Sequence, residues 1–116
     1  MKRRGRVILI VAGSAVLGLS YLLFPFFTSS IIPIQDFQFH PSILRIETGA
    51  RVLWINYDVE PHDVVSGIPG VRDQRYLSNL LNPGGTFAFT FSEAGEYQYY
   101  CSIHPYMTGK IIVEDP

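Results

Sequence analysis

Apolar and polar residues alternate in short runs along most of the chain after residue 36. In "RVLWIN", Val52, Trp54 and Asn56 would share one face of a strand, and Leu53 and Ile55 the other. Runs of the same kind, rich in aromatic and β-branched residues, cover residues 37–39, 86–91, 97–101 and 110–114. Turn signals with glycine separate them, so the pattern predicts an all-β sandwich or barrel of about 7–8 strands.

One stretch departs from this alternation. In "VRDQRYLSNLL", residues 71–81, the apolar residues Tyr76, Leu77, Leu80 and Leu81 recur at helical spacing. Such spacing favours a helix over a strand, and Asp73 could cap its start. We therefore expect a short helix or an irregular loop here.

The N-terminal part of the chain has a different pattern. Residues 7–27 form an uncharged run of 21 residues, enough for a helix that crosses a bilayer, which needs about 20. The run exceeds the apolar region of a secretory signal and lacks a small-x-small cleavage site, so we favour an uncleaved anchor over a removed signal. Four basic residues precede the run: Lys2, Arg3, Arg4 and Arg6. Their charge predicts a cytoplasmic N-terminus and a single-pass protein of the cell membrane.

This orientation places the rest of the chain outside the cytoplasm, in a periplasm or on an archaeal cell surface. Residues 28–35, "TSSIIPIQ", are interpreted as a linker between the anchor in residues 1–27 and a domain in residues 36–116. Eight extended residues reach at most about 26–29 Å. The domain is therefore expected to work close to the membrane.

The charge of the exported part is acidic. Residues 31–116 contain five basic and ten acidic residues, because four of the nine basic residues precede the anchor. This balance argues against binding of nucleic acid or of anionic lipid. We expect a monomer.

Three residues with metal-binding side chains lie close together near the C-terminus, in "CSIHPYM". Cys101 is the only cysteine, so it makes no internal disulfide. A loop after the strand can direct Cys101, His104 and Met107 toward one centre, and thiolate, imidazole and thioether suit copper. Taken alone, each of these residues has a structural role as its ordinary interpretation. A buried cysteine, for example, usually only fills the core.

A trigonal copper site of this type needs a second histidine. The chain offers His40, in "FQFHPS", and His62, in "NYDVEPHDV". His62 follows the predicted strand 51–56, where a loop should turn, and we therefore prefer His62.

These residues resemble those of the cupredoxins, the small blue (type I) copper proteins. "CSIHPYM" fits their C-x2-H-x2-M ligand loop, and its short spacing is most similar to amicyanins, since plastocyanins have more residues between His and Met. "VLWIN" followed by "PHDV" is similar to the strand that leads to the family's first histidine. The resemblance covers most of residues 34–114, apart from the stretch 68–82. It implies a Greek-key sandwich.

The resemblance also implies residue roles. His62, Cys101 and His104 would be equatorial copper ligands, and Met107 the axial ligand. Asn56 would tie the two copper loops together, and Ser102 would lie in the surrounding hydrogen-bond network. Electrons would pass through the exposed edge of His104, beside Pro105 and Tyr106.

The function implied is a membrane-anchored carrier of single electrons between redox proteins, not an enzyme, because protein ligands fill all four positions around one copper ion. Two alternatives remain at this point. The domain would either deliver or store copper without redox cycling, or serve as an interaction domain that holds zinc or no metal.

Overall fold

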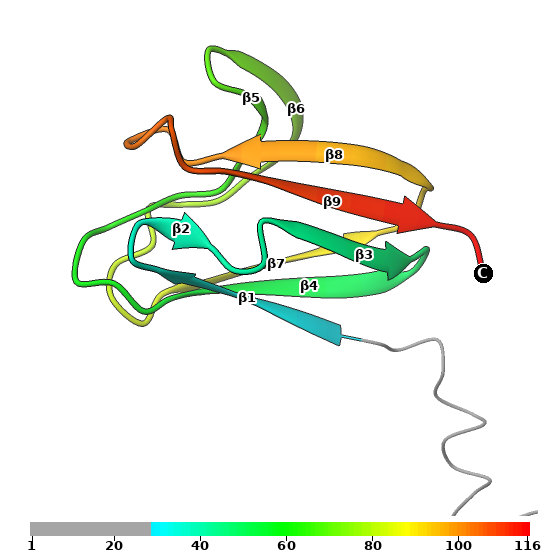
Figure 1. Ribbon diagram of the computed structural model, residues 1–116, viewed down its shortest axis with the longest axis horizontal. Helices are drawn as coiled ribbons and strands as arrows, with labels where there is room; N and C mark the ends of the chain where they lie inside the picture. Colours follow the sequence, from blue (N-terminus) through cyan, green and yellow to red (C-terminus); the bar gives the residue numbers. More distant parts are fainter. Residues whose placement is uncertain (1–28) are drawn as a thin grey trace, which may run out of the picture.

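Residues 29–116 are described by the computed structural model, and they form nine β-strands in two packed sheets (Figure 1). The first sheet has the order β2-β1-β4-β7, with bounds Gln38–Phe39, Ser29–Gln35, Ala50–Asn56 and Thr86–Phe91. The second has the order β3-β9-β8-β5-β6, with bounds Ile43–Glu47, Thr108–Glu114, Gly95–Tyr100, Val65–Ile68 and Val71–Leu77. The predicted all-β sandwich is confirmed, with nine strands in this part of the chain instead of 7–8.

The core between the sheets follows the alternation read from the sequence. Along β4, Val52, Trp54 and Asn56 are fully buried. The Trp54 ring meets the edge of Tyr99, from β8 in the opposite sheet, at 5.4 Å between centroids, and Phe87 of the neighbouring strand at 5.5 Å. Burial of large aromatic side chains dominates the energy of such a core.

The segment predicted as a linker is part of the sandwich. Residues 29–35 form β1, which pairs in parallel with β4 from Ser29 opposite Arg51 to Ile34 opposite Asn56. Ile32 and Ile34 are fully buried. The prediction of a linker over residues 28–35 was wrong for these residues, because a parallel partner distant in sequence provides the pairing and leaves no local signal.

The predicted helix or irregular loop at residues 71–81 was wrong for residues 71–77, whereas residues 78–81 lie outside the named strands. Val71–Leu77 form β6, which pairs antiparallel with β5. The Ser66 hydroxyl donates to the Tyr76 carbonyl and accepts from the Arg75 and Tyr76 amides. Gln74 has a φ of 64°, and this irregularity in the strand breaks the alternation of side chains. Pairing with β5 thus overrides the helical spacing.

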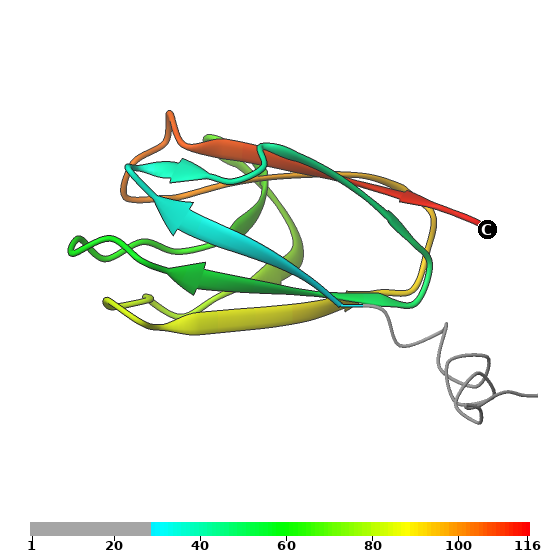
Figure 2. The ribbon, with the colours of Figure 1, turned by 60° about the horizontal axis from the view of Figure 1, so that its bottom comes forward.

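The loops that follow β4, β6 and β8 gather at one end of the sandwich, together with the turn between β1 and β2 (Figures 1 and 2). The start of β1 and the C-terminus lie at the opposite end. No helix within residues 29–116 is long and apolar enough to cross a membrane. The predicted anchor at residues 7–27 lies outside the described residues.

Candidate metal centre

Three of the predicted ligands meet at the end of the sandwich that carries these loops. The Cys101 Sγ lies 3.8 Å from the His62 Nδ1 and 3.8 Å from the His104 Nδ1. The three ligand atoms all lie within 4.8 Å of one another. One thiol sulfur and two imidazole nitrogens at this spacing form a donor set suited to copper.

Two backbone hydrogen bonds to Leu81 hold His62 in place. Its amide donates to the Leu81 carbonyl at 3.1 Å, and the Leu81 amide donates to the His62 carbonyl at 2.7 Å. The side chain is fully buried. This bridge between two loops fixes the histidine although it lies outside the named strands.

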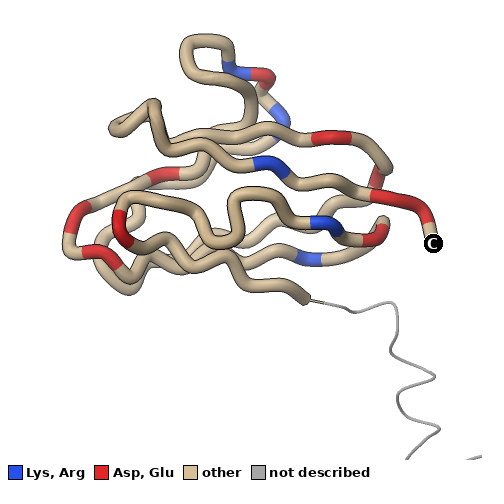
Figure 3. The backbone as a smooth tube through the Cα atoms, viewed as in Figure 1, with Lys and Arg blue, Asp and Glu red and all other residues tan. Residues whose placement is uncertain are grey.

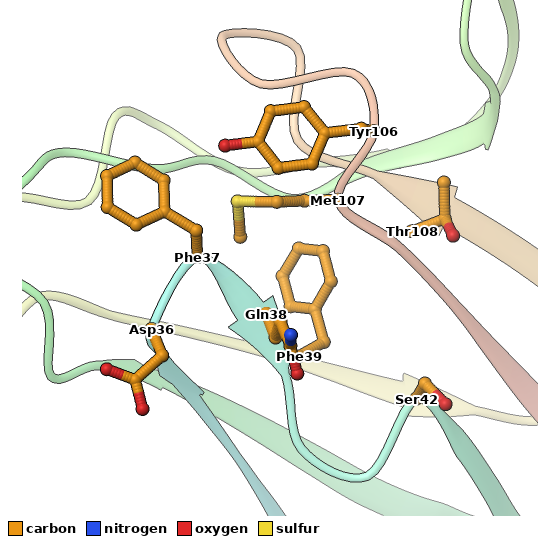
Figure 4. Close-up of a pocket in the computed structure, with 8 residues that line it drawn as sticks. All are labelled: Asp36, Phe37, Gln38, Phe39, Ser42, Tyr106, Met107 and Thr108. Atoms are coloured by element: carbon orange, nitrogen blue, oxygen red, sulfur yellow. The ribbon is translucent and has the colours of Figure 1, made fainter.

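Cys101 follows directly after β8 and begins a closed turn. Its amide donates to the Met107 carbonyl at 3.0 Å, and the Met107 amide donates to the His104 carbonyl at 2.8 Å. Met107 is 2% exposed. Its side chain lines a pocket of about 330 Å³ together with Phe37 and Tyr106 (Figure 4). The short turn therefore keeps the three predicted ligands of "CSIHPYM" in one compact loop.

The centre is buried except at one imidazole. Cys101 and His62 are fully buried, whereas His104 is partly exposed. The ring of Phe37 contacts both imidazoles edge-on, at 5.2 Å from His62 and 5.0 Å from His104. His104 is thus the predicted ligand through which the centre reaches solvent.

His40, the histidine that we did not prefer, lies elsewhere. It is exposed, and its Nε2 lies 2.9 Å from the Gln35 carbonyl oxygen. It does not belong to the group formed by His62, Cys101 and His104.

Asp63, which was not among the predicted site residues, ties the two ligand loops together. Its carboxylate accepts a hydrogen bond from the Ser102 amide at 2.7 Å and another from the Ser102 hydroxyl. Asp63 follows His62 and Ser102 follows Cys101, so the contact joins residues adjacent to two ligands. Ser102 therefore takes part in the hydrogen bonds next to the ligands through Asp63. The position of Asp63 beside a candidate ligand was the one available signal.

The side chain of Asn56 makes other contacts than those that the resemblance implied. Its side-chain amide donates to the carbonyls of Glu60 and Leu81, both at 2.9 Å, and its oxygen accepts from the Asp58 amide at 2.9 Å. These contacts brace the loop that precedes His62 against the segment around Leu81. The tie to the cysteine loop, which the resemblance assigned to Asn56, is made by Asp63.

The protonation of the cysteine affects how a metal binds. Burial raises the pKa of the Cys101 thiol, and backbone amides around it offset part of this effect. Without a metal the thiol is therefore protonated at neutral pH, and coordination of a metal by sulfur requires that this proton leaves. The soft sulfur donor and the two imidazole nitrogens, with Cys101 and His62 fully buried, fit a copper ion.

Comparisons with known proteins agree with this geometry. A family model described as copper binding proteins, plastocyanin/azurin family, matches residues 28–114. Amicyanin from Paracoccus versutus is 33% identical over 84 residues, which cover 72% of this chain and 64% of that protein. Plastocyanin from Sambucus nigra is 34% identical over 85 residues, with 65% and 86% covered. The chain spans less than two thirds of the length of the amicyanins from Paracoccus that it matches.

Solved structures give the same result. A purple cupredoxin from Nitrosopumilus maritimus matches with a TM-score of 0.68 and 34% identity, over 73% of this chain and 99% of that chain. A copper-containing nitrite reductase from Thermus scotoductus matches with a TM-score of 0.67 and 33% identity, over 76% of this chain but only 23% of that chain. The chain therefore belongs to the copper-binding plastocyanin/azurin family, the cupredoxins, and copper is its cofactor.

Proposed function

We propose that this protein is a membrane-anchored type I copper protein that carries single electrons between redox proteins on the extracytoplasmic face. The observation that carries the proposal is the convergence of the His62, Cys101 and His104 ligand atoms within 4.8 Å. A copper ion bound there supplies a one-electron couple, Cu(I)/Cu(II). Met107 would be the axial ligand.

The residues around the site favour a carrier over an enzyme. His62 and Cys101 are fully buried, and their loops are tied by Asp63 and Ser102. Such a site resists rearrangement when the charge of its metal changes, and with Met107 as a fourth ligand it would leave no open position for a substrate. The match to a nitrite reductase covers about a quarter of that chain, so it supports a shared domain and not a shared reaction.

His104 is the proposed electron port, together with Pro105 and Tyr106. His104 is the partly exposed imidazole, and the side chain of Tyr106 is 71% exposed beside it. A small surface of this kind suits a brief contact with a redox partner.

Retention of copper distinguishes the carrier from the alternative, a copper-delivery module. We expect the copper-loaded protein to give a reversible one-electron wave in voltammetry and to keep its copper during exposure to a moderate chelator. Buried ligands, held by hydrogen bonds from several loops, should release the ion slowly. Loss of the metal to the chelator within minutes, with no reversible wave, would instead favour delivery.

The proposed partner has a basic surface around its redox group. Four acidic residues lie in the loops at the metal end, namely Asp36, Asp58, Glu60 and Asp63, and these loops contain no Lys or Arg. The basic residues among positions 29–116 lie on strands away from that end (Figure 3). Such an asymmetric field steers oppositely charged partners.

This asymmetry predicts the behaviour of small redox reagents. At low ionic strength, a cationic one-electron complex should react faster with the copper protein than an anionic complex of similar driving force. The difference should shrink as salt is added, because exposed charges are screened over about 10 Å at 0.1 M. Stopped-flow kinetics at several salt concentrations measure both effects, and equal rates at low salt would contradict the proposed partner charge.

The anchor in residues 7–27 and the location outside the cytoplasm also belong to this proposal. They are supported by the uncharged run of 21 residues and the preceding basic cluster. Membrane fractionation of cells that express the full chain tests them, and a copper domain found only in the soluble fraction would contradict an uncleaved anchor.

A further inference from the structure

A carboxylate touches the predicted copper ligand His62 on the side opposite the cysteine. The His62 Nε2 lies 2.8 Å from an oxygen of Asp58, while the His62 Nδ1 faces the Cys101 sulfur. The imidazole is fully buried, and the Asp58 side chain is 10% exposed. A buried imidazole in this position donates its Nε2–H to the carboxylate, which leaves the Nδ1 lone pair directed at the metal site.

Asp58 also holds the turn between β1 and β2. Its two oxygens accept hydrogen bonds from the backbone amides of Asp36, at 2.7 Å, and Phe37, at 2.9 Å. Both of these residues have positive φ angles, 55° and 58°, which are uncommon for residues other than glycine. The turn places the Phe37 ring against His62 and His104. One carboxylate therefore fixes both the imidazole and the ring that covers it.

Three hydrogen-bond donors surround this carboxylate. They are the backbone amides of Asp36 and Phe37 and the Nε2 of His62. A carboxylate that accepts the second N–H of a ligating imidazole makes the ligand more electron-rich. An electron-rich ligand stabilises the more highly charged ion, Cu(II), relative to Cu(I).

We propose that Asp58 is a positioning residue that sets the tautomer of His62 and holds the reduction potential of the copper centre low. This inference rests on the proposed function for its redox consequence, but the contact between Asp58 and His62 stands independently of the metal. Asp58 acts through His62 and does not itself touch the copper site.

The first test measures the potential of two charge-matched variants of the full chain. Asp58→Asn removes the carboxylate beside His62. The new amide has only one acceptor oxygen, whereas the carboxylate accepts from three donors, the His62 ring and the amides of Asp36 and Phe37. Glu60→Gln removes an equal charge two residues away, from an exposed side chain for which the structure gives no hydrogen bond to His62. Voltammetry of the copper-loaded proteins then separates the contact with the imidazole from the general effect of charge.

We expect Asp58→Asn to shift the balance toward Cu(I) by tenfold or more, since loss of such an outer partner typically changes metal affinity by about 10–100-fold. A tenfold shift raises a one-electron potential by about 59 mV. Glu60→Gln should shift the reduction potential much less. A shift in Asp58→Asn no larger than that in Glu60→Gln would overturn the proposal, whereas no redox wave in the parent protein would overturn the proposed function instead.

The second test uses the parent protein without metal and needs no substitution. Nitrogen-15 NMR should show a proton on the His62 Nε2 that exchanges slowly with water, because it is buried and bonded to Asp58. A ring proton on Nδ1 alone, or a rapidly exchanging Nε2 proton, would overturn the proposal. This spectrum decides the matter even if Asp58→Asn fails to fold.

Discussion

Replacement of Cys101 by serine is expected to abolish the intense visible absorption of the protein loaded with Cu(II). That absorption would arise from charge transfer between the cysteine sulfur and the ion, and the chain contains no other cysteine. Serine is nearly isosteric, and the fully buried position should tolerate it at modest cost in stability. The variant should therefore fold, bind copper less tightly, and show only the pale spectrum of an ion with nitrogen and oxygen ligands.

A control for this experiment keeps the number of thiols constant. The double variant Cys101→Ser, Ser92→Cys places the thiol in an exposed loop between β7 and β8, at the end opposite the metal centre. Absorption spectra at equal copper content should show no recovery of the intense band. A parent protein that itself gives only a pale spectrum would contradict the assignment of Cys101 as a copper ligand.

Replacement of Trp54 by alanine is expected to have the largest effect on stability. Trp54 is fully buried and joins the two sheets through its contacts with Tyr99 and Tyr76. Truncation of a buried tryptophan typically costs about 3–5 kcal/mol, and the free energy of unfolding of a small domain is about 5–15 kcal/mol. Urea denaturation of the metal-free protein measures the loss without the added stability from bound copper.

Two further variants locate the source of this loss. Trp54→Phe retains an aromatic ring between the sheets and should cost clearly less than Trp54→Ala. Ile31→Ala truncates a side chain on β1 that is 54% exposed, and its effect should stay within about 0.5 kcal/mol. A cost for Trp54→Ala below about 1 kcal/mol would show that this contact between the sheets contributes little.

Side-chain alternation predicted the fold class because it reflects local burial. Along β4 the buried residues occur at every second position, as a strand between core and solvent requires. The two errors have different causes. β1 pairs in parallel with β4, about 20 residues further along the chain, so nothing in the local sequence indicates its partner. β6 pairs with its neighbour β5, but the positive φ of Gln74 lies within β6 and breaks the alternation by which the sequence would have shown a strand.

The metal centre was predictable where the spacing of residues carried the information. Cys101, His104 and Met107 occur within seven residues, and the strand before His62 indicated which histidine would join them. The contacts of Asp58 and Asp63 were not predictable in this way. Asp63 meets Ser102 across 39 residues, and Asp58 meets a turn more than 20 residues before it. An acidic residue near a candidate ligand is common in any sequence. Its hydrogen-bond partners are fixed only when the loops fold.

Strand β1 has a consequence for the height of the centre above the lipid. The strand begins at Ser29 and runs to the metal end, where the next residues, Asp36 and Phe37, contact Asp58 and the imidazoles. With residues 7–27 in the bilayer as proposed, seven residues at about 3.3 Å each would raise the centre about 20 Å above the surface if the strand stands upright. Electron exchange would then take place with a protein that projects into the aqueous compartment, and a small carrier dissolved among the acyl chains would stay out of reach.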